Sequence, residues 1–244
     1  MMLGRLAAAT FILAATMSTL CAAADHRLLV LDGSWVKWGK LQWGAGATVT
    51  YAFASGPQTS PGARNCAALQ PFAELVKRTG LPQAQVESAA QSAFTAWSEV
   101  TGLTFIATKD PARADIVIGA QGNPAGRAFT NVELEAGPVA QAPAVERGFT
   151  VAAEPPSHGG KPQGLRQIRK ALICFNALEK WKIGFDGDLD VYDLRYTLTH
   201  EIGHAIGLDH PGAAGALMGF RYDEKQNSLT RGDIAAVQRL YGPR

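Results

Sequence analysis

One long stretch of the chain alternates between apolar and polar residues with a helical period. Between Pro82 and Gly102, apolar side chains return every three or four positions, which places them on one face of a helix. Pro82 suits the first turn of such a helix, and Gly102 suits its C-terminal stop. We therefore predict a helix here whose apolar face packs in the core. That face comprises Val86, Ala90, Phe94, Trp97 and Val100.

Other segments alternate with a period of two and are rich in β-branched and aromatic residues, a pattern typical of strands. The clearest is ATVTYAFA, at residues 47–54. We also predict strands at 103–107, 114–120 and 171–175.

Two further segments have helical features. Residues 66–80 are predicted to hold a short helix that is interrupted near Pro71, and residues 192–207 follow a helical period. Between them, residues 121–167 form a long stretch with weak periodicity and many Gly, Pro and Ala residues. A connection of that length within a compact domain usually serves a function.

The last predicted element is a helix at residues 230–241. Thr230 and Asp233 have the spacing of a capping box, in which side chains and backbone groups of the first turn satisfy one another. Gly242 and Pro243 then stop the helix.

Residues 1–24 have the pattern of a secretory signal peptide. Arg5 supplies a positive charge, residues 6–24 carry no charge, and a small-residue cleavage site precedes Asp25. The alternatives are an uncleaved membrane anchor, since such a run nearly spans a bilayer, and a lipoprotein attached through Cys21. We adopt cleavage, which predicts a secreted or periplasmic protein.

The composition excludes several classes of protein. The chain has 244 residues, of which 47% are hydrophobic and 18% are charged, and this balance argues against disorder. A net charge of +2 without a dense Lys/Arg cluster predicts no nucleic-acid partner. No second apolar run of spanning length follows the leader. We expect residues 25–244 to form a single domain that is monomeric and has no membrane segment.

Removal of the leader would leave two cysteines, Cys66 and Cys174. In an oxidising compartment two remaining thiols usually pair. A bridge across so long a loop would contribute about 4–5 kcal/mol. Sequence separation does not fix the distance between their Cα atoms, so two free thiols are the alternative.

Three of the five histidines lie within eleven residues, in the order His200-Glu201-x-x-His204 and then Gly207 and His210. The first two are one helical turn apart, so both imidazoles project from one face and can hold one zinc ion. Gly207 can adopt the positive φ that turns the chain and brings His210 in as a third ligand. Three nitrogen ligands leave a fourth position for water, as in catalytic zinc sites, and Glu201 flanks that side. The alternative is a helix with two surface histidines and a third in a loop.

This extended pattern resembles the metzincin signature, in which H-E-x-x-H-x-x-G-x-x-H is followed by a methionine turn. Met218, in ALMGF, takes the place of that methionine and by resemblance forms an apolar floor beneath the ligands. Further segments resemble the matrixins, the matrix-metalloproteinase branch, and frame residues 36–242 in the family's order. They are AFTAWSEVT at 93–101, ADIVIGA at 114–120, Trp38 followed by TVTYAFA, and residues 233–242.

The resemblance implies an α+β fold. It would contain a twisted mixed β-sheet, about three main helices, and an active-site cleft between a larger N-terminal and a smaller C-terminal subdomain. The zinc helix would span about 192–207, and the C-terminal subdomain about 208–244. One catalytic zinc, Glu201 as general base, and protein or peptide substrates, including extracellular matrix, are implied as well.

The resemblance also suggests where a substrate lies. Phe220 and Tyr222 would line the pocket for the residue after the cut bond; the alternative is that they are ordinary surface aromatics. A substrate would lie extended along an edge strand and add main-chain hydrogen bonds to it. Residues 126–134, GRAFTNVEL, are the best candidate for that strand.

The chain departs from the family pattern at several places. Pro211 follows the third histidine, as in serralysins, but their C-terminal calcium-binding repeats are not expected here, nor is a cysteine switch. His158 is the only histidine between the first strand and the zinc helix, so we do not expect the second, structural zinc of animal matrixins. Gly232 replaces the first of two adjacent family aspartates. Asp233 matches the second, which hydrogen-bonds around the methionine turn, although helix capping explains it equally well. The chain therefore best resembles a minimal, bacterial-type matrixin.

Three other features have weaker functional interpretations. The DGDLD run at 186–190 has carboxylates that suit calcium, but it lacks the full EF-hand spacing, and a solvated acidic turn is the interpretation we adopt. Asp32 could ligate zinc and block it before activation. The N-terminal tryptophans are interpreted as core packing rather than as a ligand-stacking surface; they are Trp35, Trp38 and Trp43.

The sequence therefore predicts a secreted zinc-dependent endopeptidase that uses a zinc-activated water and Glu201 as general base. Two alternatives have different functions. One is a zinc hydrolase of a non-protein substrate, which the motif alone does not distinguish. The other is a catalytically silent binding protein with a metzincin fold, against which the presence of Glu201 and all three histidines argues.

Overall fold

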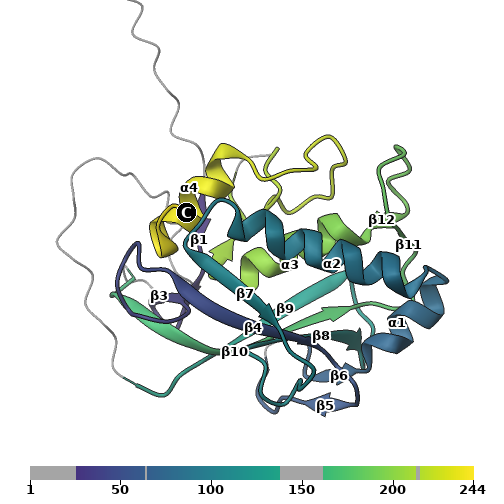
Figure 1. Ribbon diagram of the computed structural model, residues 1–244, viewed down its shortest axis with the longest axis horizontal. Coiled ribbons are helices and arrows are strands. Elements are labelled where there is room, and N and C mark those ends of the chain that lie inside the picture. The colour runs from purple at the N-terminus through teal and green to yellow at the C-terminus, as the bar shows by residue number, and fades with distance from the viewer. Residues whose placement is uncertain (1–25, 64, 138–161, 213–214) are drawn as a thin grey trace, which may run out of the picture.

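The computed structural model describes residues 26–63, 65–137, 162–212 and 215–244 (Figure 1). The predicted leader at 1–24 and His158 lie outside these residues. Among the described residues, no helix combines the length and the apolar character needed to cross a bilayer. The helices are α1 (Phe72–Thr79), α2 (Gln83–Ser98), α3 (Leu194–Ala205) and α4 (Arg231–Tyr241). The strands are β1 (Arg27–Leu28), β2 (Val30–Leu31), β3 (Ser34–Lys37), β4 (Ala47–Phe53), β5 (Gln58–Thr59), β6 (Ala68–Gln70), β7 (Leu103–Ala107), β8 (Ile116–Gln121), β9 (Ala128–Leu134), β10 (Leu165–Phe175), β11 (Trp181–Lys182), β12 (Tyr192–Asp193) and β13 (Leu208–Asp209).

Strand β10 organises the main sheet. Its first residues pair in parallel with β3, and its last residues pair in parallel with β8. Beyond β8 lie β4 and then β7, both in parallel register. Strand β9 runs antiparallel to β10, and among the described strands it has no other partner. The mixed sheet confirms the predicted α+β class, and β9 is one of its edges.

Helices α2 and α3 lie side by side over one face of this sheet (Figure 1). Trp97 on α2 is fully buried, and its indole Nε1 donates a hydrogen bond of 2.9 Å to the carbonyl of Thr199 on α3. Trp38 donates in the same way, over 2.8 Å, to the carbonyl of Ala205 at the end of α3. Trp97 of α2 and Trp38, which follows β3, thus fix the position of α3 through these hydrogen bonds. Both are core residues, as the sequence predicted.

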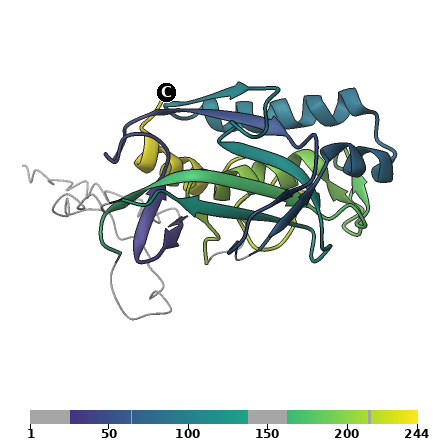
Figure 2. The ribbon, with the colours of Figure 1, turned by 90° about the horizontal axis from the view of Figure 1, so that it is seen from below.

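The opposite face of the sheet carries a smaller apolar cluster. Along β10, Ile173 and Phe175 face the helices, whereas Leu172 and Cys174 belong to this second cluster. The segment between β4 and α1 packs there, and its β6 pairs antiparallel with β8. Figure 1 shows β5 and β6 of this segment below β8, and in Figure 2, where the molecule is seen from below, the segment crosses in front of the sheet.

The sequence predicted most elements, but several boundaries differ. The helix expected over 66–80 begins only at Phe72, because residues 68–70 pair with β8 instead. The predicted helix 82–102 ends at Ser98. In place of a helix from residue 192, Tyr192–Asp193 form β12, which pairs with β11. The weakly periodic stretch 121–167 contains β9, and β10 starts six residues before the predicted strand at 171–175.

The N-terminal tryptophans pack in the structure. Trp38 is buried, and the rings of Trp35 and Trp43 meet edge to face at 5.4 Å. The Arg239 guanidinium of α4 lies 4.8 Å from the centre of the Trp43 ring. These contacts join the start of the domain to its last helix and support the packing interpretation.

Lys37 is a fully buried lysine at the end of β3. Its ammonium donates hydrogen bonds to the carbonyls of Lys40, Gln42 and Ala45, over 2.7, 3.0 and 2.9 Å. It also lies 5.1 Å from the centre of the Tyr241 ring. The Lys37 ammonium therefore holds the loop that follows β3, because it donates to three backbone carbonyls that water would otherwise bind.

Replacing Lys37 with methionine should lower the free energy of unfolding by about 2–4 kcal/mol, because three partly buried backbone carbonyls lose their donor. Urea unfolding followed by fluorescence measures the change. Lys40→Met, at an exposed neighbour, is the matched control and should alter stability little. Equal stability of the two variants would contradict the role given to the buried ammonium.

Candidate metal centre and cleft

Helix α3 begins at a buried carboxylate. Asp193 caps the helix: its Oδ1 accepts the Tyr196 N–H over 2.6 Å, and its Oδ2 accepts the Gly184 N–H over 2.6 Å. Burial raises the pKa of this carboxyl above its usual value. The cap fixes the first turn, and His200 and His204 follow on the face of α3 that lines the cleft.

The chain turns sharply after α3. Gly207 has φ of +97°, and a Cβ at this position would collide with the backbone carbonyl of Val36. The next two residues form β13, which pairs antiparallel with β1. This turn brings His210 to the two helical histidines.

The three histidine Nε2 atoms form a compact triangle. The distances are 3.1 Å from His200 to His204, 3.1 Å from His200 to His210, and 3.2 Å from His204 to His210. Two ligands at zinc–nitrogen bond length on a tetrahedral ion lie about 3.3 Å apart. The triangle therefore fits one zinc ion, and the donor set is one that zinc prefers.

The second ring nitrogens are held by backbone carbonyls. Nδ1 of His200 lies 2.8 Å from the Leu217 carbonyl, and Nδ1 of His204 lies 2.9 Å from the Leu208 carbonyl. A carbonyl accepts the Nδ1 proton, so each Nε2 lone pair faces the common centre. Burial lowers the pKa of His200 well below its ordinary value and that of His210 to about 4. The His200 and His210 rings are therefore neutral at pH 7, as imidazole ligands of a metal must be.

A methionine lies beneath the histidines. Met218 is buried, and a Cβ on Gly203 of α3 would collide with its sulfur, so glycine permits this close approach. Asp233 of α4 holds the turn: its Oδ1 accepts the Met218 N–H over 3.4 Å, and its Oδ2 accepts the Leu217 N–H over 3.2 Å. Asp233 also completes a capping box with Thr230. The two sequence interpretations of Asp233 therefore both hold.

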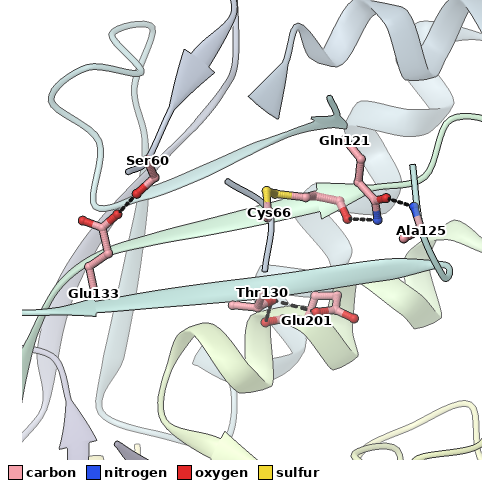
Figure 3. The surroundings of a disulfide bond; sticks show 8 residues. Ser60, Cys66, Gln121, Ala125, Thr130, Glu133 and Glu201 are labelled. Atoms are coloured by element: carbon pink, nitrogen blue, oxygen red, sulfur yellow. Dashed lines mark hydrogen bonds between the residues drawn. A yellow bond between two sulfur atoms is a disulfide. The ribbon is translucent and has the colours of Figure 1, made fainter. Parts of the chain in front are cut away.

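Glu201 lies beside the histidines and faces β9. Its Oε2 accepts the hydroxyl proton of Thr130 over 2.7 Å (Figure 3). The residue is only 6% exposed. Burial raises the pKa of the carboxyl above its usual value, although the Thr130 hydrogen bond acts in the opposite direction.

A cleft of about 430 Å³ surrounds this centre. Strand β9 forms one wall, and Phe220 and Tyr222, the predicted pocket residues, also line the cleft. The Phe220 ring is exposed and meets His210 edge to face at 5.2 Å. The Tyr222 hydroxyl accepts the Asp193 N–H and donates to Glu224, each over 2.8 Å, which ties this segment to the start of α3.

Other cleft residues were not predicted from the sequence. Leu29 and Leu31, next to β1 and on β2, line it, as does Asn65 from the segment before α1. The Leu29 N–H donates to the Gly207 carbonyl over 2.8 Å, which places the segment around Leu29 beside the turn that leads to His210. The segments around Leu29 and Gly207 are far apart in sequence, so no local sequence pattern could predict that Leu29 lines the cleft.

The remaining candidates lie away from the histidines. Cys66 and Cys174 form a disulfide with a Cα–Cα distance of 6.0 Å, on the sheet face opposite α3 (Figure 3). The Asp32 carboxylate lies 3.4 Å from Arg166 and is not among the residues that line the cleft. In the acidic run, the Asp186 carboxylate contacts the Lys182 ammonium, which is 2.6 Å from Glu224. These ion pairs support the acidic-turn interpretation.

The mixed sheet, the two helical histidines with a third after the glycine turn, and the methionine beneath them define a metzincin domain. The family model for Matrixin matches residues 156–242. Karilysin from Tannerella forsythia is 31% identical over 156 residues, covering 64% of this chain and 28% of its own length. Matrix metalloproteinase-18 from Xenopus laevis is 33% identical over 165 residues, covering 66% and 30%. Metalloendoproteinase 5-MMP from Arabidopsis thaliana is 28% identical over 168 residues, covering 65% and 40%. These matches support a matrixin-like metzincin, and they span 28–40% of these relatives' lengths.

Proposed function

We propose that this chain is a secreted zinc-dependent endopeptidase whose catalytic domain spans residues 25–244. The observation that carries the proposal is the triangle of three histidine Nε2 atoms with the Glu201 carboxylate in the same cleft. The names of the relatives, which are metalloproteinases and a metalloendoproteinase, support it. The apolar run at residues 1–24 supports secretion.

In this proposal His200, His204 and His210 hold the zinc, and Met218 supports them from below. When bound, zinc supplies Lewis acidity, which polarises a peptide carbonyl and lowers the pKa of water. Glu201 acts as the general base: it takes a proton from the attacking water at its carboxylate and returns that proton to the leaving amine.

The substrate is proposed to bind as an extended peptide along β9. The outer edge of β9 lies in the cleft wall, and an added strand gains main-chain hydrogen bonds there. Phe220 and Tyr222 would then bound the pocket for the residue after the cut bond. Leu29 and Leu31 add apolar side chains to the lining of the cleft.

Removal of zinc should abolish activity. Protein that begins at Asp25 is incubated with a mixed-peptide pool, with and without a zinc chelator, and cleavage is read by mass spectrometry. We expect cleavage that stops with the chelator and returns when zinc is added back, because the three histidines alone supply no nucleophile. Cleavage that persists with no zinc in the protein would contradict the proposal.

The same assay separates the alternative functions. Protein that holds one zinc ion per chain and cleaves no peptide, but hydrolyses members of a panel of esters, amides or glycosides, would be a hydrolase of another substrate class. Zinc-loaded protein that cleaves nothing would be a binding protein. The cut sites of an active peptidase would define the preference of the Phe220 and Tyr222 pocket.

A further inference from the structure

A threonine of the edge strand contacts the carboxylate of Glu201. Thr130 lies in the middle of β9, and its side chain points toward α3 (Figure 3). Its Oγ1 lies 2.7 Å from Oε2 of Glu201 and 3.0 Å from the backbone carbonyl of the same residue. This contact joins residues 71 positions apart in the chain.

The chemistry of the contact favours the carboxylate as acceptor. A hydroxyl has one proton to donate. A bond to an ionised oxygen is shorter and stronger than one to a neutral carbonyl, and the carboxylate contact is the shorter of the two. Among the described residues, Oε2 accepts this bond and Oε1 accepts none from the protein. The hydroxyl therefore distinguishes the two oxygens and leaves Oε1 available to a water molecule.

The backbone around Thr130 holds the hydroxyl in place. Residues 128–134 pair with β10 along most of their length, and Thr130 itself is opposite Ile173, which is fully buried. Val132, two residues along on the same face of β9, packs against the main core. The position of the hydroxyl is thus set by the sheet, whereas Glu201 is on the helix that crosses it.

We propose that Thr130 is a positioning residue that orients the Glu201 carboxylate for proton transfer. The inference rests on the proposed peptidase function and extends it to β9. Strand β9, which is proposed to bind the substrate backbone, also holds the Glu201 carboxylate through Thr130. The substrate peptide and the carboxylate are therefore positioned by the same strand. Loss of the hydroxyl lets the carboxylate rotate and lowers the fraction of time that Oε1 faces the water.

The test compares Thr130→Val, which keeps the shape and removes the hydroxyl, with Thr130→Ser, which keeps the hydroxyl. We expect kcat of Thr130→Val to fall about ten-fold to a hundred-fold with KM nearly unchanged, and Thr130→Ser to retain most of kcat. Thr104→Val makes the same change on an exposed residue of β7 and should have wild-type kinetics. Zinc content and Tm are measured for all variants of the full chain, so that loss of metal or of folding is detected.

Crystal structures of the wild-type chain and of Thr130→Val give a readout that does not depend on activity. We expect one Glu201 rotamer bonded to Thr130 in the wild type, and a rotated or divided carboxylate in the variant. An unchanged carboxylate in Thr130→Val, unchanged kcat, or equal losses in the Val and Ser variants would overturn the inference. Wild-type protein that positions Glu201 as described but cleaves no peptide would overturn the proposed function and leave the positioning role standing.

Discussion

Replacing Glu201 with glutamine should lower kcat by about a hundred-fold to ten-thousand-fold, the range for loss of a general acid–base group. Glutamine keeps the size of the side chain and can still accept the Thr130 hydroxyl proton, but its amide does not take a proton from water. The three histidines are untouched, so one zinc ion per chain should remain. Steady-state kinetics on a peptide identified from the pool, together with metal analysis, measures both quantities.

The control for this variant is Glu99→Gln, which makes the same change at an exposed residue after α2. It should leave kcat, zinc content and Tm as in the wild type. A Glu201→Gln protein with full zinc and wild-type kcat would remove Glu201 from the mechanism. Loss of zinc together with kcat would instead assign the residue to metal binding.

Removing the disulfide should give the largest loss of stability. In a variant with Cys66→Ala and Cys174→Ala, the free energy of unfolding should fall by about 4–5 kcal/mol and Tm by about 10 °C or more. The bridge spans 108 positions in sequence, so its loss frees a long loop in the unfolded chain. Calorimetry under non-reducing conditions measures the change in Tm.

A comparison with reduced protein serves as the control. A reductant should lower the Tm of the wild type towards that of the double variant and leave the double variant unchanged. Cys174 is fully buried, so part of the loss comes from the packing of its side chain. A double variant with the wild-type Tm would show that the bridge adds nothing to stability.

The elements that could be predicted from the sequence are those whose structure depends on residues close together in the chain. The spacing of His200 and His204 is a property of one helix turn, and the Thr230–Asp233 capping box lies within four residues. By contrast, residues 68–70 are a strand only because β8 offers them an edge. Strand β10 begins early because β3 pairs with Leu165–Gln167. Such pairing is tertiary and overrides local propensity.

The same distinction applies to the site. The metal triangle follows from a motif of eleven residues, whereas the Thr130–Glu201 contact joins a weakly periodic stretch to a helix 71 residues later. Leu29 reaches the cleft through a backbone bond to Gly207. Residues 126–134 were predicted to form the substrate strand, so Thr130 lay in the right segment. Nothing in that segment indicated which side chain would face α3.

The Asp233 carboxylate links the turn that holds Met218 to the last helix, α4. The same two oxygens accept protons from the methionine turn and from the first turn of α4. Fraying of that first turn therefore takes away the support of Met218, so the two segments open as one cooperative unit. Zinc binding and amide protection from hydrogen exchange in α4 are then thermodynamically linked, and an ion held by the three histidines disfavours the opening of a helix that does not contact it.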